Sequence, residues 1–359
     1  MPENSPPSLE YQIYDPERQE IRVVVIQPPR RRYWLHALLF LLTIFTTVCI
    51  GAKLQYNFDH NLGAYVDNSD LWPWLWIMED WRRLLMGIPF SACLLGILTA
   101  HEFGHFIYCV RRGVYATLPF FIPAPTIIGT MGAFIRIRSP IRSRSDLFDI
   151  GIAGPIAGFI VAIPILLFSL LASKPYNGAP PVDSLVLGLP LIFNVAHWAL
   201  AAMGSHFAAQ VPLSGVYLHP TAIAAWFGMF ATALNLIPGG QLDGGHIVFS
   251  LRPTWHRSVS RFFIAVLLVL SWFLWVGWLL WAIVLRITGE RHPAVPLHPE
   301  VDTKRWWLGA FALLMLVLTF VPSPFPGASG REALKQWKEE RQKTQQQTSP
   351  APPMAYLLK

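Results

Sequence analysis

The sequence predicts an all-α polytopic membrane protein with about six transmembrane segments and a small β element on the cytoplasmic side. Of its 359 residues, 53% are hydrophobic and only 14% are charged, whereas an average soluble domain is about 25% charged. The mean hydropathy is +0.41. The apolar residues also form runs that are too long for a water-facing surface. These observations exclude a disordered chain, a fibrous rod and an ordinary soluble enzyme.

Apolar runs mark the expected transmembrane segments, since a helix needs about 20 apolar residues to cross a bilayer. The runs are residues 33–52, 84–110, 150–172, 220–237, 262–285 and 306–321. A shorter run, 188–204, contains Pro190, Asn194 and His197 and is ambiguous between a span and a re-entrant or interfacial segment. Residues 256–288 make either one long crossing or a shallow hairpin, which leaves the side of the C-terminus open.

Basic residues beside these runs set the expected topology. Residues 30–32 are three arginines, so the positive-inside rule places the N-terminus in the cytoplasm. Arg111 and Arg112 end the second run on the same side. This pattern explains the net charge of +7 better than nucleic-acid binding does, and we expect no nucleic-acid partner. The N-terminus lacks the pattern of a cleaved signal peptide.

The chain divides into five expected regions. They are a largely flexible cytoplasmic segment (1–29) with a strand-like stretch at 21–26, the first span with an outer loop (30–83), a membrane core (84–252), additional spans (253–321) and a polar, flexible tail (322–359). Within the core, residues 132–138 (GAFIRIR) alternate apolar and charged side chains from Phe134 onward, as an edge strand does. This alternation predicts the β element.

The second apolar run contains the HExxH pattern His101-Glu102-Phe103-Gly104-His105. On a helix the two histidines project from one face and can share a Zn²⁺, with Glu102 beside the water molecule on the metal. Such polar groups are costly in an apolar helix, so they face an ion, water or a partner. A polar cluster that binds a neighbouring helix, or a purely structural metal, is the simpler alternative.

A catalytic zinc needs a third protein ligand, and Asp243 is the best candidate. It lies in residues 235–246 (NLIPGGQLDGGH), where one proline and four glycines break the helix. At membrane depth, broken backbone is tolerated only where it is buried in protein or lines a wet cavity. An acidic residue on such a segment therefore predicts a functional site.

Depth in the membrane supports this pairing. His101 precedes Arg111 by about 15 Å of helix, and Asp243 precedes Arg252 by about 13 Å if that segment is helical. The two side chains meet from the same side only if an even number of crossings separates the two arginines. Residues 188–204 should therefore not span fully.

Other potential ligands are weaker candidates. Cys109 lies on the same helical stripe as the motif, but one straight helix cannot close a tetrahedral site with three ligands. His206 and His219 lie near the predicted outer side. His246 is a candidate for orienting Asp243 or the broken loop from outside the metal's ligand set. A purely structural capping role for His246 is equally open.

These motifs resemble the site-2 protease family of intramembrane zinc metalloproteases. The resemblance covers about residues 84–252 and rests on four elements in family order, namely HEFGH, the stretch 129–133, GIAGPIAG and NLIPGGQLDGGH. No inserted PDZ-like domain follows the second span and no CBS pair follows the last one. The chain is therefore most similar to compact bacterial and plastid-like members.

The resemblance implies a role for each site residue. His101, His105 and Asp243 would hold one Zn²⁺ per chain, and Glu102 would be the catalytic acid/base. Asn235 would contact the substrate backbone or the developing oxyanion. For Asn235, a hydrogen bond to carbonyls freed beside the loop proline is the alternative.

The implied function is a zinc metalloendopeptidase that cleaves within or near the transmembrane helix of its substrates. The implied partners are a single-pass membrane protein or a residual signal peptide, and the lipid bilayer; the oligomeric state is left open. We expect a multi-pass protein of a bacterial cytoplasmic membrane. The strand at 132–138 would receive an unwound substrate by β-augmentation, unless it is an ordinary loop whose arginines meet lipid headgroups. A membrane metal-ion carrier and an inactive scaffold that binds transmembrane partners are the alternative functions.

Overall fold

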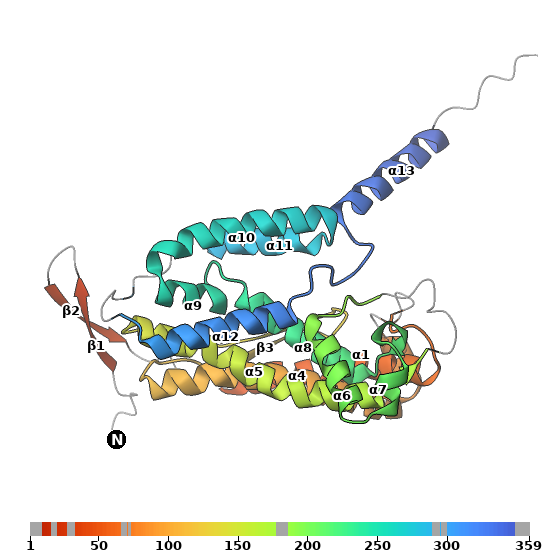
Figure 1. Ribbon diagram of the computed structural model, residues 1–359, viewed down its shortest axis with the longest axis horizontal. Coiled ribbons are helices and arrows are strands. Elements are labelled where there is room, and N and C mark those ends of the chain that lie inside the picture. The colour runs from red at the N-terminus through yellow and green to blue at the C-terminus, as the bar shows by residue number, and fades with distance from the viewer. Residues whose placement is uncertain are drawn as a thin grey trace, which may run out of the picture.

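The computed structural model describes residues 9–15, 20–26, 33–65, 70, 73–176, 186–288, 295 and 300–348. Within this part the fold is mostly helical, with three small two-stranded sheets (Figure 1). Residues 1–8, 16–19 and 27–29 of the N-terminal segment, the three arginines at 30–32 and residues 349–359 of the tail lie outside it.

Four described helical segments are long and apolar enough to cross a membrane. They are α1 (Tyr33–Asp59), Trp81–Arg111 (the short turn η1, Trp81–Arg83, followed by α4, Leu84–Arg111), α5 (Arg144–Ala172) and α10 (Pro253–Phe273). The other two predicted runs form α8 (Pro220–Leu236) and α12 (Thr303–Thr319), with 17 residues each. The total of about six spans therefore stays a prediction.

The ambiguous run 188–204 forms α6 (Leu191–Ala202), whose 12 residues extend for about 18 Å. This is well short of a hydrocarbon core of about 30 Å. Short elements complete this end of the fold, namely α7 (His206–Gln210), η2 (Leu213–Gly215) and the paired strands β5 (Lys174–Pro175) and β6 (Val216–Tyr217).

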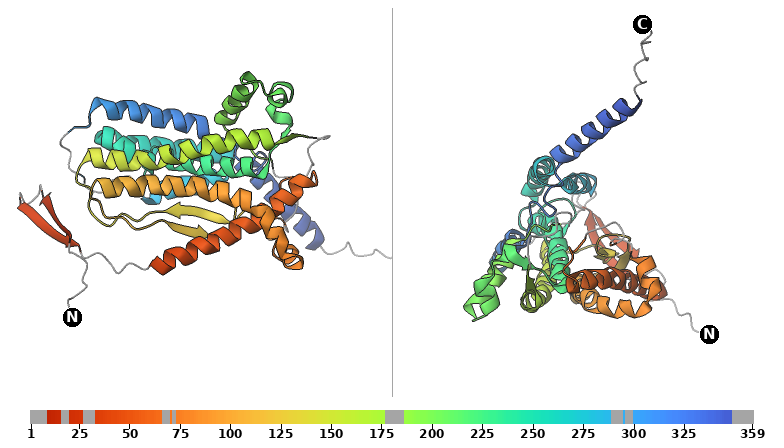
Figure 2. Two further views of the ribbon diagram at one scale, coloured as in Figure 1. Left: turned by 90° about the horizontal axis from the view of Figure 1, so that it is seen from below. Right: turned by 90° about the vertical axis from the view of Figure 1, so that its right-hand side faces the viewer.

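The core helix of the bundle is α8, and 14 of its 17 residues are buried. It packs against α4, α5 and α12 (Figure 2). Small side chains allow this close approach: a Cβ on Gly228 would lie 2.7 Å from Ile97 of α4. The Trp226 indole is fully buried, and its N–H donates to the carbonyl of Gly188 at 2.6 Å. This polar group of the core is thus satisfied internally, as the bilayer requires.

Two β-hairpins flank the helices. The predicted strand at 21–26 is confirmed as β2 (Glu20–Ile26), which pairs with β1 (Leu9–Asp15). The predicted strand at 132–138 is confirmed in part: β4 (Thr130–Phe134) pairs with β3 (Phe120–Pro123), and only an isolated bridge between Ala116 and Ile137 follows.

The β3–β4 hairpin lies along α1 and α4 (Figure 2). Two side chains of α1 donate to carbonyls that border the strands: His36 Nδ1 to Pro119, just before β3, at 3.1 Å, and Thr46 Oγ1 to Gly129, just before β4, at 2.6 Å. Tyr65 OH donates to Ile127 at 2.7 Å. These bonds anchor the start of β3 and the turn between β3 and β4.

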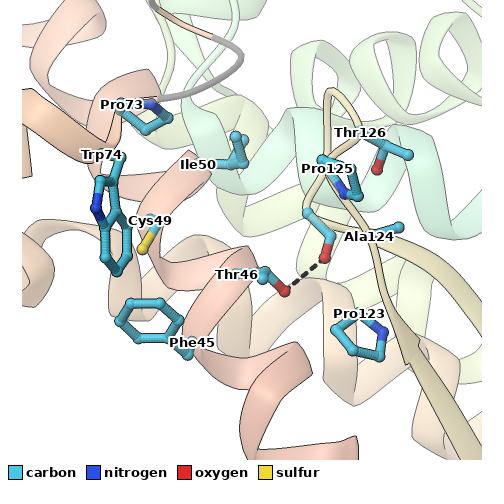
Figure 3. A pocket seen from close by; sticks show the side chains of 11 residues that line it. Phe45, Thr46, Cys49, Ile50, Pro73, Trp74, Pro123, Ala124, Pro125 and Thr126 are labelled. Carbon is cyan, nitrogen blue, oxygen red and sulfur yellow. Dashed lines mark hydrogen bonds between the residues drawn. The ribbon is translucent and has the colours of Figure 1, made fainter.

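An apolar pocket of about 210 Å³ lies between α1, the short helix α3 (Trp74–Glu79) and the hairpin turn (Figure 3). Phe45 and Trp74 line one side of it and meet edge to face, with ring centroids 5.5 Å apart. Among the described residues that line it, Cys49 is the only one with a side chain that titrates. The described part of its lining therefore offers space for hydrocarbon but no pair of groups for acid–base or metal chemistry.

The C-terminal part consists of α9 (Asp243–Leu251), α10, α11 (Gly277–Thr288), α12 and α13 (Gly330–Thr348). The chain turns between α10 and α11, and the two helices lie side by side (Figure 1), so residues 256–288 form a helical hairpin. Part of the tail expected to be flexible forms the polar helix α13, which projects away from the bundle (Figures 1 and 2).

Candidate metal centre

Two histidines from α4 and one aspartate from α9 meet in the interior. His101 and His105 are only 4% and 6% exposed, and their rings approach edge to face at 5.0 Å. Asp243 Oδ2 lies 3.2 Å from Nε2 of each histidine, and the three potential ligand atoms lie within 4.8 Å of one another. The structure thus joins residues that are 142 positions apart in the chain.

A backbone carbonyl orients the His105 ring. The Nδ1–H of His105 donates to the carbonyl of Ile150 at 2.7 Å, which leaves the lone pair of Nε2 facing Asp243. A hydrogen bond at the second nitrogen is the usual means of holding a metal-ligating histidine in one tautomer and one orientation.

Glycines of α5 make room for both histidines. A Cβ on Gly154 would lie 2.1 Å from Nε2 of His105, and one on Gly158 would lie 3.2 Å from Cβ of His101. On α4, a Cβ on Gly104 would lie 2.4 Å from the carbonyl of Ala153. The GIAGPIAG pattern therefore serves close contact between α4 and α5 at the level of the site.

Glycines also shape the loop that presents Asp243. Gly240 has a φ of +57°, which favours glycine. A Cβ on Gly244 would lie 2.1 Å from the carbonyl of Leu236, so α9 folds back tightly against the end of α8. As a result Asp243, the first residue of α9, reaches the level of the two histidines.

Glu102 is 6% exposed and interacts electrostatically with His101, His105 and Asp243. Its carboxylate accepts a hydrogen bond from the backbone N–H of Ile135, the residue after β4. The segment expected to form the β element thus touches the candidate acid/base directly.

Two further predicted residues lie close by. Asn235 Nδ2 is 3.3 Å from Nε2 of His101, so this amide faces the potential ligands. His246 lies on the first turn of α9, where its backbone N–H donates to Leu242 at 2.9 Å and its Cβ packs beside Gly151 of α5.

Among the described residues, the group that can hold a metal ion is His101, His105 and Asp243. Cys109 instead lies fully buried in an apolar cluster with Val114 and Ile150. This placement fits the apolar role that Cys109 has in a protein core.

The donor set fits Zn²⁺. Two imidazole nitrogens and a carboxylate oxygen are a common ligand set for catalytic zinc, with the fourth position open. Ligands at about 2.05 Å in a tetrahedral arrangement lie about 3.3 Å apart. The 3.2 Å between Asp243 Oδ2 and each Nε2 agrees with this spacing.

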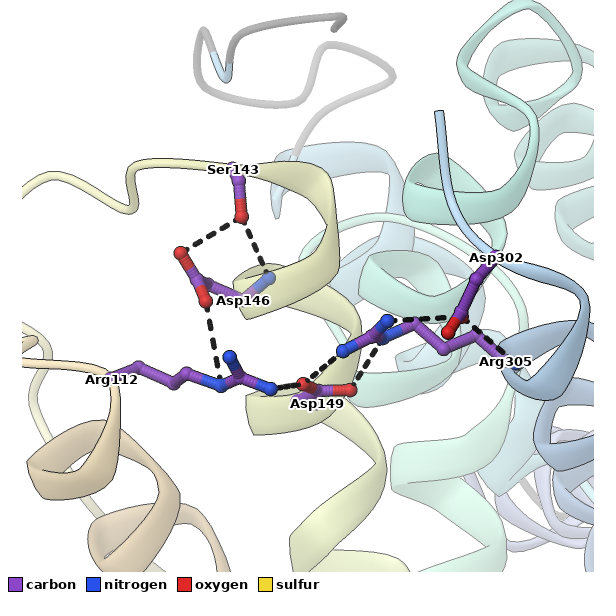
Figure 4. A network of polar contacts seen from close by, with 6 residues as sticks. All are labelled: Arg112, Ser143, Asp146, Asp149, Asp302 and Arg305. Atoms are coloured by element: carbon purple, nitrogen blue, oxygen red, sulfur yellow. Dashed lines mark hydrogen bonds and ion pairs between the residues drawn. The ribbon is translucent and has the colours of Figure 1, made fainter. Parts of the chain in front are cut away.

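An ion network near one end of the bundle was not predicted (Figure 4). Asp149 of α5 pairs with Arg112 after α4 and with Arg305 of α12, the latter at 2.6 and 2.7 Å. Arg112 also lies 3.4 Å from Asp146. In the sequence Arg112 carries only a topology signal, and nothing there indicates that Asp149 joins α4, α5 and α12.

Residues 89–277 match the family model described as Peptidase family M50. The chain belongs to this family. The match confirms the resemblance to the site-2 proteases, and the family range contains all of the residues described above as facing the site.

Relatives of this peptidase family member are found in plants. The chain is 31% identical over 321 residues to the "Probable zinc metalloprotease EGY1, chloroplastic" of Arabidopsis thaliana, covering 84% of the chain and 56% of the relative. For the Arabidopsis "Probable zinc metalloprotease EGY2, chloroplastic" the identity is 31% over 272 residues, with 71% and 45% covered. For EGY1 of Oryza sativa subsp. japonica it is 30% over 306 residues, with 81% and 50% covered. The chain thus spans about half the length of these relatives.

Proposed function

We propose that this chain is an intramembrane zinc metalloendopeptidase of the HExxH type. The observation that carries the proposal is the convergence of His101, His105 and Asp243 at zinc-ligand spacing, with the Glu102 carboxylate beside them. Membership of Peptidase family M50 and relatives named as zinc metalloproteases support it. One Zn²⁺ per chain would be held by the three ligand atoms.

Each residue of the site has a role in the proposed hydrolysis. Zn²⁺ bound there would polarise the scissile carbonyl and lower the pKa of a water molecule. Glu102 takes a proton from that water and returns it to the leaving amine nitrogen. The Ile135 N–H holds the Glu102 carboxylate in place. Asn235, 3.3 Å from Nε2 of His101, is positioned to donate to the substrate carbonyl oxygen as it becomes negatively charged.

The proposed substrate is a single-pass membrane protein or residual signal peptide whose helix unwinds at the site. Because α1 packs mainly against β3, an extended substrate would join β4. Two observations support this: β4 ends beside the Glu102 partner Ile135, and Met131 and Phe134 of β4 are 72% and 45% exposed.

Photo-crosslinking tests the β4 route. A photoreactive residue at Met131 of the Glu102→Gln protein should crosslink a substrate peptide, whereas one at the similarly exposed Trp198 of α6 should not. Equal crosslinking at both positions, or none at Met131, would exclude binding along β4.

The proposed location is a bacterial cytoplasmic membrane with the N-terminus in the cytoplasm. The names of the EGY relatives place those plant proteins in the chloroplast. Basic residues gather at one end of the bundle, at the ends of α4, α5, α9 and α12, where Arg112 and Arg305 share Asp149 and Arg252 lies over Trp306 at 5.6 Å. This end is cytoplasmic by the positive-inside rule.

Metal analysis and cleavage assays test the proposed activity. Wild type, Glu102→Gln and the exposed control Glu79→Gln are purified in detergent, analysed for zinc, and assayed on single-pass substrates with helix-breaking residues. We expect all three to bind zinc, while Glu102→Gln loses cleavage by about 10²–10⁴-fold. A zinc chelator should abolish cleavage by wild type, and added zinc should restore it.

Other outcomes favour the rival functions. Bound zinc without cleavage of any substrate, in several lipid mixtures, would favour a metal carrier or a scaffold. Equal cleavage by wild type and Glu102→Gln would exclude Glu102 as the base.

A further inference from the structure

Two buried polar side chains of α10 hold one glycine of the loop before Asp243. His256 and Ser260 lie one helical turn apart and are 2% and 1% exposed. The Nε2–H of His256 donates to the carbonyl of Gly240 at 3.0 Å, and the Gly240 N–H donates to Ser260 Oγ at 3.2 Å. Both backbone polar groups of Gly240 are thus bonded by side chains of a single helix.

Gly240 is pressed against the α10–α11 hairpin. It has a φ of +57°, and a Cβ on it would lie 2.4 Å from Thr288 Oγ1 and 3.3 Å from Leu285 of α11. A side chain at this position would therefore push the loop off the hairpin. Because residue 240 is a glycine, the loop packs directly on α10 and α11, and these two helices determine its position.

The position of Gly240 determines the position of the first turn of α9. A Cβ on Gly245 would lie 2.4 Å from the carbonyl of Gly240 and 2.6 Å from that of Gly239, so the first turn of α9 rests on these two peptide groups. Asp243 is the first residue of the same turn. A shift of Gly240 consequently shifts the backbone that carries the Asp243 carboxylate.

We infer that His256 and Ser260 are positioning residues for Asp243. By holding both polar groups of Gly240, they set the distance between the Asp243 carboxylate and the His101–His105 pair, and they couple the α10–α11 hairpin to metal affinity. This inference rests on the metal site of the proposed function. Neither side chain touches the ligands, so both act through the loop.

The tolerance of a zinc site explains why such a clamp matters. Ligand distances stay within about 0.2 Å of their ideal values, and the loop consists of a proline, two glycines and two other residues before Asp243. Glycine gives the backbone many alternative conformations. Without bonds at Gly240, the carboxylate would sample positions outside the ligand range.

The test compares zinc affinity and the visible spectrum of the Co²⁺-loaded full-length protein. The variants are His256→Ala, His256→Gln, Ser260→Ala and the control His206→Ala, an exposed histidine on α7. We expect His256→Ala to weaken zinc binding by about 10–100-fold, the range for residues that orient metal ligands. It should also change the Co²⁺ absorption bands, which report ligand geometry, and Ser260→Ala should do both to a smaller extent.

Rescue separates positioning from general stability. The Gln amide N–H can reach the Gly240 carbonyl, so His256→Gln should recover affinity and spectrum, while His206→Ala should match wild type throughout. A His256→Ala protein that melts earlier without metal, yet keeps the wild-type zinc affinity and Co²⁺ spectrum, would overturn the inference. If wild type itself takes up no metal, the proposed function falls, and the inference falls with it.

Discussion

The tightest contact at the metal site lies between Gly154 of α5 and the His105 ring, and a single methyl group should break the site. In Gly154→Ala the new Cβ would lie 2.1 Å from Nε2, 2.4 Å from Cδ2 and 2.5 Å from Cε1 of His105. Ordinary contact needs at least 3.4 Å. The ring must therefore retreat by about 1.3 Å, the difference between 3.4 Å and 2.1 Å.

Neither the backbone at Gly154 nor the His105 ring can move away easily. Gly154 lies in the interior of a 29-residue helix, and the His105 ring is tied to the Ile150 carbonyl at 2.7 Å. A zinc site tolerates about 0.2 Å of ligand displacement, so His105 would be lost as a ligand. We expect zinc affinity to fall by at least about 100-fold, which corresponds to about 2.8 kcal/mol. Cleavage should fall with it.

A graded series of glycine substitutions provides the controls. In Gly158→Ala the Cβ would lie 3.2 Å from Cβ of His101, a clash that a shift of a few tenths of an ångström relieves, so zinc binding should weaken only slightly. In Gly96→Ala no atom lies within 4 Å, and the helix should gain about 0.5–1 kcal/mol. Zinc titration of the three purified variants is the assay. Equal zinc affinity for Gly154→Ala and Gly96→Ala would refute the reasoning.

Two further predictions concern stability. Asp149→Asn should lower the unfolding free energy by about 2–3 kcal/mol in detergent, less than the 3–5 typical of a fully buried pair, because the Arg112 side chain is 37% exposed; the exposed Glu339→Gln should change it by less than about 1 kcal/mol. Burial lowers the pKa of His219, whose neutral ring accepts from the Thr221 N–H, so this stabilisation is present above pH 6.5 and is lost as the pH falls below it. Wild type should therefore lose thermal stability relative to His219→Asn in acid, and parallel melting curves would contradict this.

The chemistry of the site was largely readable from the sequence because polar groups in apolar helices are rare. His101 and His105 sit at ligand spacing, and Asp243 follows a run of helix breakers. Counting residues to Arg111 and Arg252 placed these groups at one depth, and the structure brings them to 3.2 Å.

Other features depend on contacts that no pattern in one segment encodes. His256 and Ser260 look like ordinary polar residues near the start of an apolar run, and their bonds to Gly240 exist only once α10 has packed on the loop. The turn between α10 and α11 follows no proline or glycine, since Gly277 comes after it. Hydropathy therefore gives no sign that the run ends there.

A sequence signal for α13 did exist. Ser329 and Glu332 form a reciprocal capping box: the Glu332 N–H donates to Ser329 Oγ at 3.2 Å, and the Ser329 N–H donates to Glu332 Oε2 at 3.0 Å. The high content of Lys, Gln and Glu that follows favours a helix as much as a flexible tail.

The burial of α8 constrains how the protein is made. Once it has left the ribosome, this helix faces lipid on the side that α12 later covers, and α12 begins only at Thr303. At about 5–20 residues per second, synthesis of the intervening chain takes on the order of seconds. During that interval the side of α8 that carries Ala233 and Leu236 is open to other helices in the bilayer. Completion of α12 therefore ends a period in which the nascent protein is vulnerable to mispairing.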